Sequence, residues 1–302
     1  MTTPHSHDED FDRFRRSGMA AGATKAIGTA FANARTRVAA VLVRLGARPN
    51  HVTVAGFLIT LVAAGCFVVG TGHHAPYERA VQGVAQSYWP LLAALFLILA
   101  GACDMLDGAV ARLSGGGSAF GGVLDSTLDR FSDIAVYLGM CIHFAGIGNL
   151  TYATLAVVAM CNGYMISYVK ARAEDFVDDC SVGYWLRGER CAGLVLASLC
   201  SHVPAWLWLQ ATTPLATVVR RLWHTHSKLR EADGRTRRQS APAAPPGIVL
   251  SILRGETPRG SAAYDLVSLI TIGWFVAAPW VHPFFYGGSD PLRRILSPIL
   301  AM

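Results

Sequence analysis

Long apolar windows separated by short polar stretches fill the middle of the chain. Six of them form a compact set, at about 52–71, 87–103, 131–148, 150–169, 188–201 and 203–219. A bilayer core needs about 20 apolar residues per helix, so the pattern predicts six transmembrane helices, the last two from short windows interrupted by Gly and Ser. A seventh window at about 262–285 contains Asp265, Pro279 and Pro283, and these residues favour an interfacial or re-entrant helix over a full crossing.

The segment before the first window has a different pattern. Residues 23–48 place Ala, Ile, Phe, Val and Leu on one side of a helix and Lys25, Arg35, Arg37 and Arg44 on the other. Such a helix is expected to lie in the anionic headgroup layer of a membrane, although an ordinary packed helix has a similar pattern. The fold class predicted is therefore an all-α integral membrane protein. It is a six-transmembrane-helix bundle with an N-terminal amphipathic helix and an extra C-terminal hydrophobic segment.

The polar stretches suggest where the segments divide. The first 22 residues are polar and too hydrophilic for a cleaved signal peptide, so we expect a disordered cytoplasmic tail. Basic residues followed by Ala and Pro predict a linker. The expected order is a tail at 1–22, the amphipathic helix at 23–48, a membrane domain at 49–229, the linker at 230–261 and the hydrophobic segment at 262–302.

Composition supports a membrane protein and excludes several other classes. Only 15% of the residues are charged and 52% are hydrophobic, whereas soluble domains carry about a quarter charged residues. This argues against a large soluble enzyme, a disordered chain and a nucleic-acid-binding protein. The seven cysteines form no CxxC pair and no zinc-spaced cluster with His, so we expect buried small hydrophobic residues and no disulfide or metal site.

The net charge of +6 is first a clue to topology, because cytoplasmic loops of membrane proteins are enriched in Lys and Arg. If the N-terminus lies in the cytoplasm, Arg79 is the only Lys or Arg in the predicted loops on the opposite side of the membrane. We therefore predict a multi-pass protein of the cell (inner) membrane whose basic face points to the cytoplasm. The cytoplasmic side would carry Arg112, Arg130, Lys170, Arg172, Arg187, Arg190, Arg220, Arg221, Lys228 and Arg230.

The acidic residues that matter chemically lie in one stretch, 104–133. Asp104 and Asp107 share one face of a helix that leaves the second window, and Asp125, Asp129 and Asp133 recur every four residues on the helix that enters the third. A Gly-rich turn at 114–118 separates the two helices, so their carboxylate faces can meet at the cytoplasmic surface.

A group of carboxylates this close needs cations, because like charges raise one another's pKa values and desolvation adds to the cost. Oxygen ligands without His or Cys select hard divalent ions, Mg²⁺ or Mn²⁺. Two ions about 4 Å apart would hold a diphosphate and stabilise a departing phosphate. Gly108, Ala111 and Gly121 lie on the same faces and leave room for a nucleotide, and Arg112 can pair with phosphate.

The alternative for any single Asp is a helix cap or a solvated residue, and Gly-rich turns usually only connect. Helical register, small neighbours and the position at two helix ends make this alternative weak for the group as a whole.

This stretch resembles the signature of the CDP-alcohol phosphotransferase family at every fixed position. The matching residues span 26 positions, and the resemblance extends from about Pro49 to about Leu229. They are Asp104, Asp107, Gly108, Ala111, Arg112, Gly121, Asp125 and Asp129.

The resemblance implies a homodimeric six-helix membrane enzyme with two divalent ions. It assigns Asp104, Asp107 and Asp125 as metal ligands. Asp129 would be the general base that deprotonates the acceptor hydroxyl, and it would also touch the second metal. The hydroxyl then attacks the β-phosphorus of a CDP-linked lipid and CMP leaves. Residues Asp107, Gly108, Ala111, Arg112 and Gly121 would bind the CDP part.

Three basic segments bear on the acceptor, and they resemble segments of the phosphatidylinositol phosphate synthases within that family. They are Ser167–Glu174, Arg187–Arg190 and Thr217–Leu222. By this resemblance Lys170, Arg172, Arg190 and Arg221 would form a pocket for the phosphate of inositol 1-phosphate. Positive-inside snorkelling would place basic residues at the same helix ends without any ligand.

The expected activity is transfer of a phosphatidyl group from CDP-diacylglycerol to a phosphorylated polyol, with inositol 1-phosphate the first choice. Phosphatidylglycerophosphate synthesis from glycerol 3-phosphate remains open, because it needs a similar basic pocket. A divalent-cation transporter is the alternative from another class, although transport sites usually lie near the membrane midplane.

Overall fold

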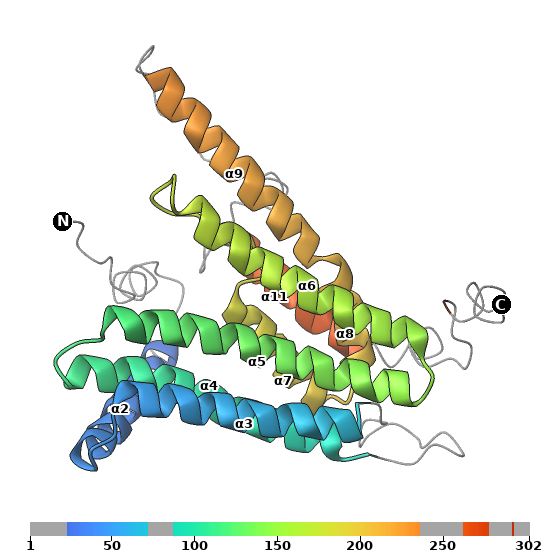
Figure 1. Ribbon diagram of the computed structural model, residues 1–302, viewed down its shortest axis with the longest axis horizontal. Helices are drawn as coiled ribbons and strands as arrows, with labels where there is room; N and C mark the ends of the chain where they lie inside the picture. Colours follow the sequence, from blue (N-terminus) through green and yellow to red (C-terminus); the bar gives the residue numbers. More distant parts are fainter. Residues whose placement is uncertain (1–22, 72–86, 236–261, 278–291, 293–302) are drawn as a thin grey trace.

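The computed structural model describes residues 23–71, 87–235, 262–277 and 292. Within these ranges the secondary structure is α-helical and contains no strand (Figure 1). The helices are α2 (Ala23–Arg44), α3 (Pro49–Val69), α4 (Trp89–Leu113), α5 (Ala119–Gly146), α6 (Leu150–Ala173), α7 (Arg187–Leu199), α8 (Val203–Thr212), α9 (Pro214–Arg235) and α11 (Ala262–Ala277). The predicted tail at 1–22 and most of the predicted linker lie outside the described residues.

Helix α3 packs against both α4 and α5 (Figure 1). Gly139 makes part of this packing possible, because a Cβ at that position would lie 2.5 Å from the carbonyl oxygen of Ala64. The backbones of α3 and α5 therefore approach one another without an intervening side chain. This close approach fixes the second half of α5 against α3.

Helices α6, α7, α8, α9 and α11 form the second part of the bundle. Helix α6 contacts α5, α8 and α9, whereas α7 contacts α4 and α8. The hydrophobic core is shared between both parts, and its largest fully buried members include Phe67, Met140, Ile166, Trp206 and Phe275. Helix α7 therefore bridges the acidic helix α4 and the second part of the bundle.

Three helices are long and apolar enough to cross a membrane: α3, α4 and α6. They correspond to the first, second and fourth predicted windows. Helix α5 has 28 residues and carries Asp125, Asp129, Arg130 and Asp133 between its first turns and its middle. Helices α7 and α8 have 13 and 10 residues, and each is shorter than a bilayer requires.

The sixth predicted window, 203–219, is wrong as a single helix. Helix α8 ends at Thr212 and α9 begins at Pro214, continuing to Arg235. Proline lacks the N–H that would continue the hydrogen bonding of α8, and it restricts Thr213 before it. The first residues of the predicted linker, 230–235, therefore belong to α9.

The helix predicted near the N-terminus is present as α2. Ala39 is buried against a small cluster with Val52, Ala109 and Val110, while Phe31 and other apolar residues are exposed. One side of α2 thus packs on α3 and α4, and its predicted position in the headgroup layer stays a prediction. Cys161 and Cys191 are exposed, whereas the cysteines were predicted to be buried.

Candidate active site

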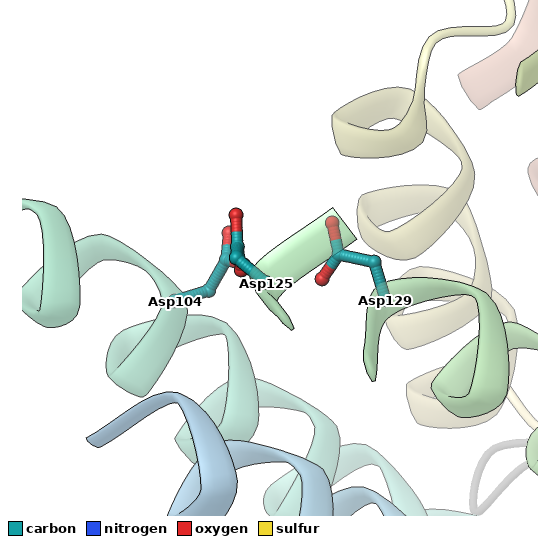
Figure 2. A group of neighbouring side chains, drawn as sticks. All are labelled: Asp104, Asp125 and Asp129. Atoms are coloured by element: carbon teal, nitrogen blue, oxygen red, sulfur yellow. The ribbon is translucent and has the colours of Figure 1, made fainter. Parts of the chain in front are cut away.

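Three carboxylates from two helices meet at one point of the structure. Asp104 comes from α4, and Asp125 and Asp129 come from successive turns of α5 (Figure 2). One carboxylate oxygen of each lies within 4.8 Å of the others. The convergence predicted from helical register is therefore present for these three residues.

The turn between α4 and α5 produces this arrangement. Gly115 and Gly116 have φ angles of 94° and 113°, in a region that side chains other than glycine rarely adopt. Ser118 then caps α5, and its Oγ accepts a hydrogen bond of 2.9 Å from the amide of Gly121. The chain thus reverses within a few residues and brings the two acidic faces together.

The donor set fits a hard divalent cation. All three residues offer oxygen, which Mg²⁺ and Mn²⁺ prefer. Oδ1 of Asp125 is buried and has no hydrogen-bond partner among the described residues, and a buried unpaired carboxylate oxygen is costly unless a cation binds it. Asp107, the remaining residue of the predicted metal site, lies outside this trio. Its carboxylate accepts a hydrogen bond of 2.9 Å from Thr53 Oγ1.

Asp125 and Asp129 lie outside the three helices that could cross a membrane. The pKa values of both carboxyl groups are raised. Burial raises the pKa of Asp129, the positive charge of Arg187 opposes this shift, and the charge of Asp125 adds to it, so that the pKa is about 7. Burial and the charge of Asp104 also raise the pKa of Asp125. Without metal, Asp129 is therefore only partly ionised near neutral pH, and bound cations would favour its charged form.

Arg187 is a member of the site to which the sequence analysis assigned no role. Its guanidinium forms ion pairs of 2.9 Å with Asp104 Oδ1 and 2.7 Å with Asp129 Oδ1. It comes from the first turn of α7, about 60 to 80 residues after the acids along the chain. The need of the carboxylates for a counter-cation was the available signal, but the sequence does not show which of several arginines supplies it.

The small residues predicted to make room for a nucleotide lie on the same two helices. A Cβ at Gly108 would meet only Arg112, whose Nη1 lies 3.7 Å away, and Arg112 is exposed. A Cβ at Gly121 would lie 3.2 Å from Asn50 Oδ1, so this glycine also allows close packing on α3. Ala111 is half-buried. There is space beside Gly108 and Arg112, and the CDP-binding role of these residues stays a prediction.

The predicted acceptor residues on α6 point to local partners. Lys170 Nζ lies 3.6 Å from Glu174 Oε1, and Arg172 forms a 2.7 Å ion pair with Asp175. The Arg172 guanidinium also lies 5.0 Å from the ring centroid of Phe176. Both ion pairs are exposed and therefore contribute little stabilisation. Lys170 and Arg172 thus remain available to bind a ligand.

The other two predicted acceptor residues are buried. Arg190 is 4% exposed and pairs with Asp133 at 2.7 Å. Arg221 is 1% exposed and donates to the carbonyl oxygens of Val182, at 3.1 Å, and Ile166. These contacts hold the segment before α7 and the end of α6 in place. The structure therefore does not bring all four basic residues into one open pocket.

We expect Arg221→Ala to lower the free energy of unfolding by about 3 kcal/mol, because two buried carbonyl groups lose their donor. Thermal unfolding of the detergent-solubilised protein would measure this. The exposed residue Lys228, also on α9, provides the control Lys228→Ala, which should unfold as the original protein does. An Arg221→Ala protein of unchanged stability would contradict the structural role.

Comparisons with known proteins agree with this geometry. The sequence model of the CDP-alcohol phosphatidyltransferase family matches residues 47–223. An archaetidylinositol phosphate synthase of Pyrococcus horikoshii is 33% identical over 194 residues, which cover 64% of this chain and 91% of that protein. A phosphatidylinositol phosphate synthase of Mycobacteroides abscessus is 33% identical over 201 residues, or 64% and 83% of the two chains.

Solved structures give the same result. The phosphatidylinositol phosphate synthase of Mycobacterium tuberculosis with CDP-DAG bound superposes with a TM-score of 0.53 at 28% identity, covering 63% of this chain and 92% of that one. The same enzyme in complex with manganese and citrate gives 0.51 at 27% identity, covering 70% and 96%. By its sequence, its fold and its acidic site, the chain belongs to the CDP-alcohol phosphatidyltransferase family and is an enzyme of phospholipid biosynthesis.

Proposed function

We propose that the protein transfers a phosphatidyl group from CDP-diacylglycerol to a hydroxyl of inositol 1-phosphate, giving phosphatidylinositol phosphate and CMP. The observation that carries the proposal is the trio of Asp104, Asp125 and Asp129, whose carboxylate oxygens lie within 4.8 Å of one another on two helices. This cluster suits a pair of divalent ions, Mg²⁺ or Mn²⁺, that would neutralise a diphosphate.

The residues of the chain then have distinct tasks. Asp104, Asp107 and Asp125 would hold the ions, and Gly108, Ala111, Arg112 and Gly121 would contact the CDP part together with Asp107. Asp129 would accept the proton of the acceptor hydroxyl as its oxygen forms a bond to the β-phosphorus and the bond to the CMP oxygen breaks. The raised pKa of Asp129, about 7, makes it a better base at neutral pH than an ordinary carboxylate.

The names of the relatives favour inositol phosphate as the acceptor. Two relatives differ in the lipid part of their names, archaetidyl in one and phosphatidyl in the other, but share inositol phosphate. Inositol phosphate, the part of the product that comes from the acceptor, is thus common to both names. Lys170, Arg172, Arg190 and Arg221 are proposed to serve its phosphate, with the two exposed residues on α6 in direct contact and the two buried ones supporting them.

The proposed location and orientation in the membrane rest on the distribution of Lys and Arg along the chain. The protein is a membrane protein, with three helices long and apolar enough to cross a bilayer. We place it in the cell (inner) membrane with the acidic site facing the cytoplasm, acting as a homodimer on lipid and soluble substrates and not on nucleic acid. Residues 49–229 form the catalytic domain in this proposal.

The deciding experiment offers possible acceptors one at a time. Purified protein with CDP-diacylglycerol and Mg²⁺ is given inositol 1-phosphate, glycerol 3-phosphate, free inositol or serine, and CMP release is measured. We expect release with inositol 1-phosphate at least about tenfold faster than with the others. Free inositol and serine lack the phosphate that the basic residues would bind, and glycerol 3-phosphate lacks the ring of hydroxyl groups. Chelation of the divalent ions should stop the reaction.

Other outcomes would change the proposal in defined ways. Faster release with glycerol 3-phosphate would indicate phosphatidylglycerophosphate synthesis. Metal flux into liposomes without CDP-lipid, and no CMP release with any acceptor, would indicate the cation transporter.

A further inference from the structure

A second ion pair joins α7 to α5 next to the acidic site. Arg190 Nη2 lies 2.7 Å from Asp133 Oδ2, and Asp133 follows Asp129 by one turn of α5. Arg187, three residues before Arg190, pairs with Asp129 at 2.7 Å. Residues three or four apart share one face of a helix. The arginine face of α7 therefore meets the aspartate face of α5 in two successive ion pairs.

The guanidinium of Arg190 is enclosed by three parts of the chain. Besides the bond to Asp133 on α5, its Nη1 donates a 3.2 Å hydrogen bond to the carbonyl of Trp185, in the segment before α7. On α6, a Cβ at Gly163 would lie 3.5 Å from Arg190 Nε, so the guanidinium rests against this helix with no side chain between them. The side chain of Arg190 is 4% exposed. Its charge is therefore shielded from solvent and depends on Asp133 for neutralisation.

A buried guanidinium without a counter-ion is strongly unfavourable, because the remaining charge is uncompensated. If Asp133 were neutral, the next carboxylate on the same face of α5 would be that of Asp129, about 6 Å away along the helix axis. The arginine side chain is long and flexible enough to shift by one helical turn. Arg190 would then be drawn toward Asp129, which Arg187 already contacts.

We propose that Asp133 is a positioning residue of the metal site: it holds Arg190 away from Asp129, so that only one arginine of α7 competes with divalent ions for the acids. Asp133 does not need to contact the ions for this task, because it acts through Arg190. The inference rests on the proposed function, since it takes Asp104, Asp125 and Asp129 as the site of divalent ions.

Neutralising Asp133 should weaken metal binding. In Asp133→Asn, Arg190 would occupy oxygen atoms of Asp129 that a cation needs, and we expect Mn²⁺ to bind about tenfold more weakly. The loss of a nearby negative charge also weakens Mn²⁺ binding, but that effect does not depend on Arg190. The two causes therefore separate when Arg190 is replaced.

The experiment is a double-mutant cycle with Mn²⁺ affinity as its readout. Electron paramagnetic resonance measures Mn²⁺ binding to the full-length protein in detergent, without lipid or acceptor, for Asp133→Asn, Arg190→Gln and the double variant. In the Arg190→Gln background, Asp133→Asn should change the affinity by at most about twofold, because the competing guanidinium is absent. An equally large loss in both backgrounds would overturn the inference, since the lost charge alone would then explain it.

Asp133→Glu provides a second variant in case Asp133→Asn does not fold. The longer carboxylate retains the charge that pairs with Arg190, so the Mn²⁺ affinity should stay within about twofold of that of the original protein. A tenfold loss in Asp133→Glu would contradict the role of the ion pair.

Asp175→Asn is the matched control for removing one carboxylate. Asp175 also pairs with an arginine, Arg172, at 2.7 Å, but its side chain is 54% exposed, so this variant should bind Mn²⁺ normally. Weaker binding in Asp175→Asn would overturn the inference, because any lost carboxylate would then have the same effect. CMP release is measured separately. A protein that releases CMP but shows equal losses in both backgrounds keeps the proposed function and excludes the positioning role of Asp133.

Discussion

Asp129→Asn is expected to reduce phosphatidyl transfer about a thousandfold, within the range lost when a general base is removed. The amide has the same shape but cannot accept the proton of the acceptor hydroxyl. Asp104 and Asp125 keep their carboxylates, so Mn²⁺ binding should be largely retained. CMP release with CDP-diacylglycerol and inositol 1-phosphate measures the first effect, and electron paramagnetic resonance of Mn²⁺ measures the second.

The control for this variant is Ser126→Ala. Ser126 is exposed on α5 between Asp125 and Asp129, and its Oγ donates a hydrogen bond within its own helix, to the carbonyl of Gly122 at 2.8 Å. It should transfer at the normal rate. Normal turnover in Asp129→Asn would exclude Asp129 as the base, and loss of Mn²⁺ binding together with activity would make it primarily a metal ligand.

Arg187→Ala is expected to change metal binding and catalysis in opposite directions. Removing the guanidinium leaves Asp104 and Asp129 without their ion-pair partner, so Mn²⁺ should bind about fivefold to tenfold more tightly. Transfer should nevertheless fall about a hundredfold. The site then lacks a positive group that can stabilise charge on the phosphates.

Arg37→Ala provides the control for removing one positive charge. Arg37 is exposed on α2 and has no role in the site, so both Mn²⁺ affinity and transfer should remain normal. Arg187→Lys retains the charge without the two-pronged geometry and is expected to lie between the original protein and Arg187→Ala. Weaker Mn²⁺ binding in Arg187→Ala would show that the arginine supports the metal site and does not compete for it.

The acidic site could be predicted from the sequence because its residues lie close together along the chain. Asp125 and Asp129 are four residues apart, and a helix places such residues on one face. The Gly-rich turn then brings Asp104 within reach of them. Asp107 shows the limit of this argument, since its register was right but a hydrogen bond from Thr53 of α3 holds its carboxylate outside the closest group.

The basic residues could not be sorted in the same way. Lys and Arg at cytoplasmic helix ends have the same pattern whether they bind a ligand, pair with an acid or bond to a backbone carbonyl. Arg190 and Arg221 were expected in the acceptor pocket, and they lie buried on Asp133 and on two carbonyl groups. Arg187, which had no assigned role, reaches the acids.

The sequence by itself determined the helical class, the membrane environment and the acidic signature, because hydrophobic periodicity and i, i+3, i+4 spacing act over short distances along the chain. Only the tertiary structure decided which cation meets which carboxylate, that the sixth predicted window divides at Pro214, and that α11 reaches Glu189 beside the active site. Those contacts join residues about 40 to 85 positions apart, and they depend on how the helices pack, which no local pattern specifies.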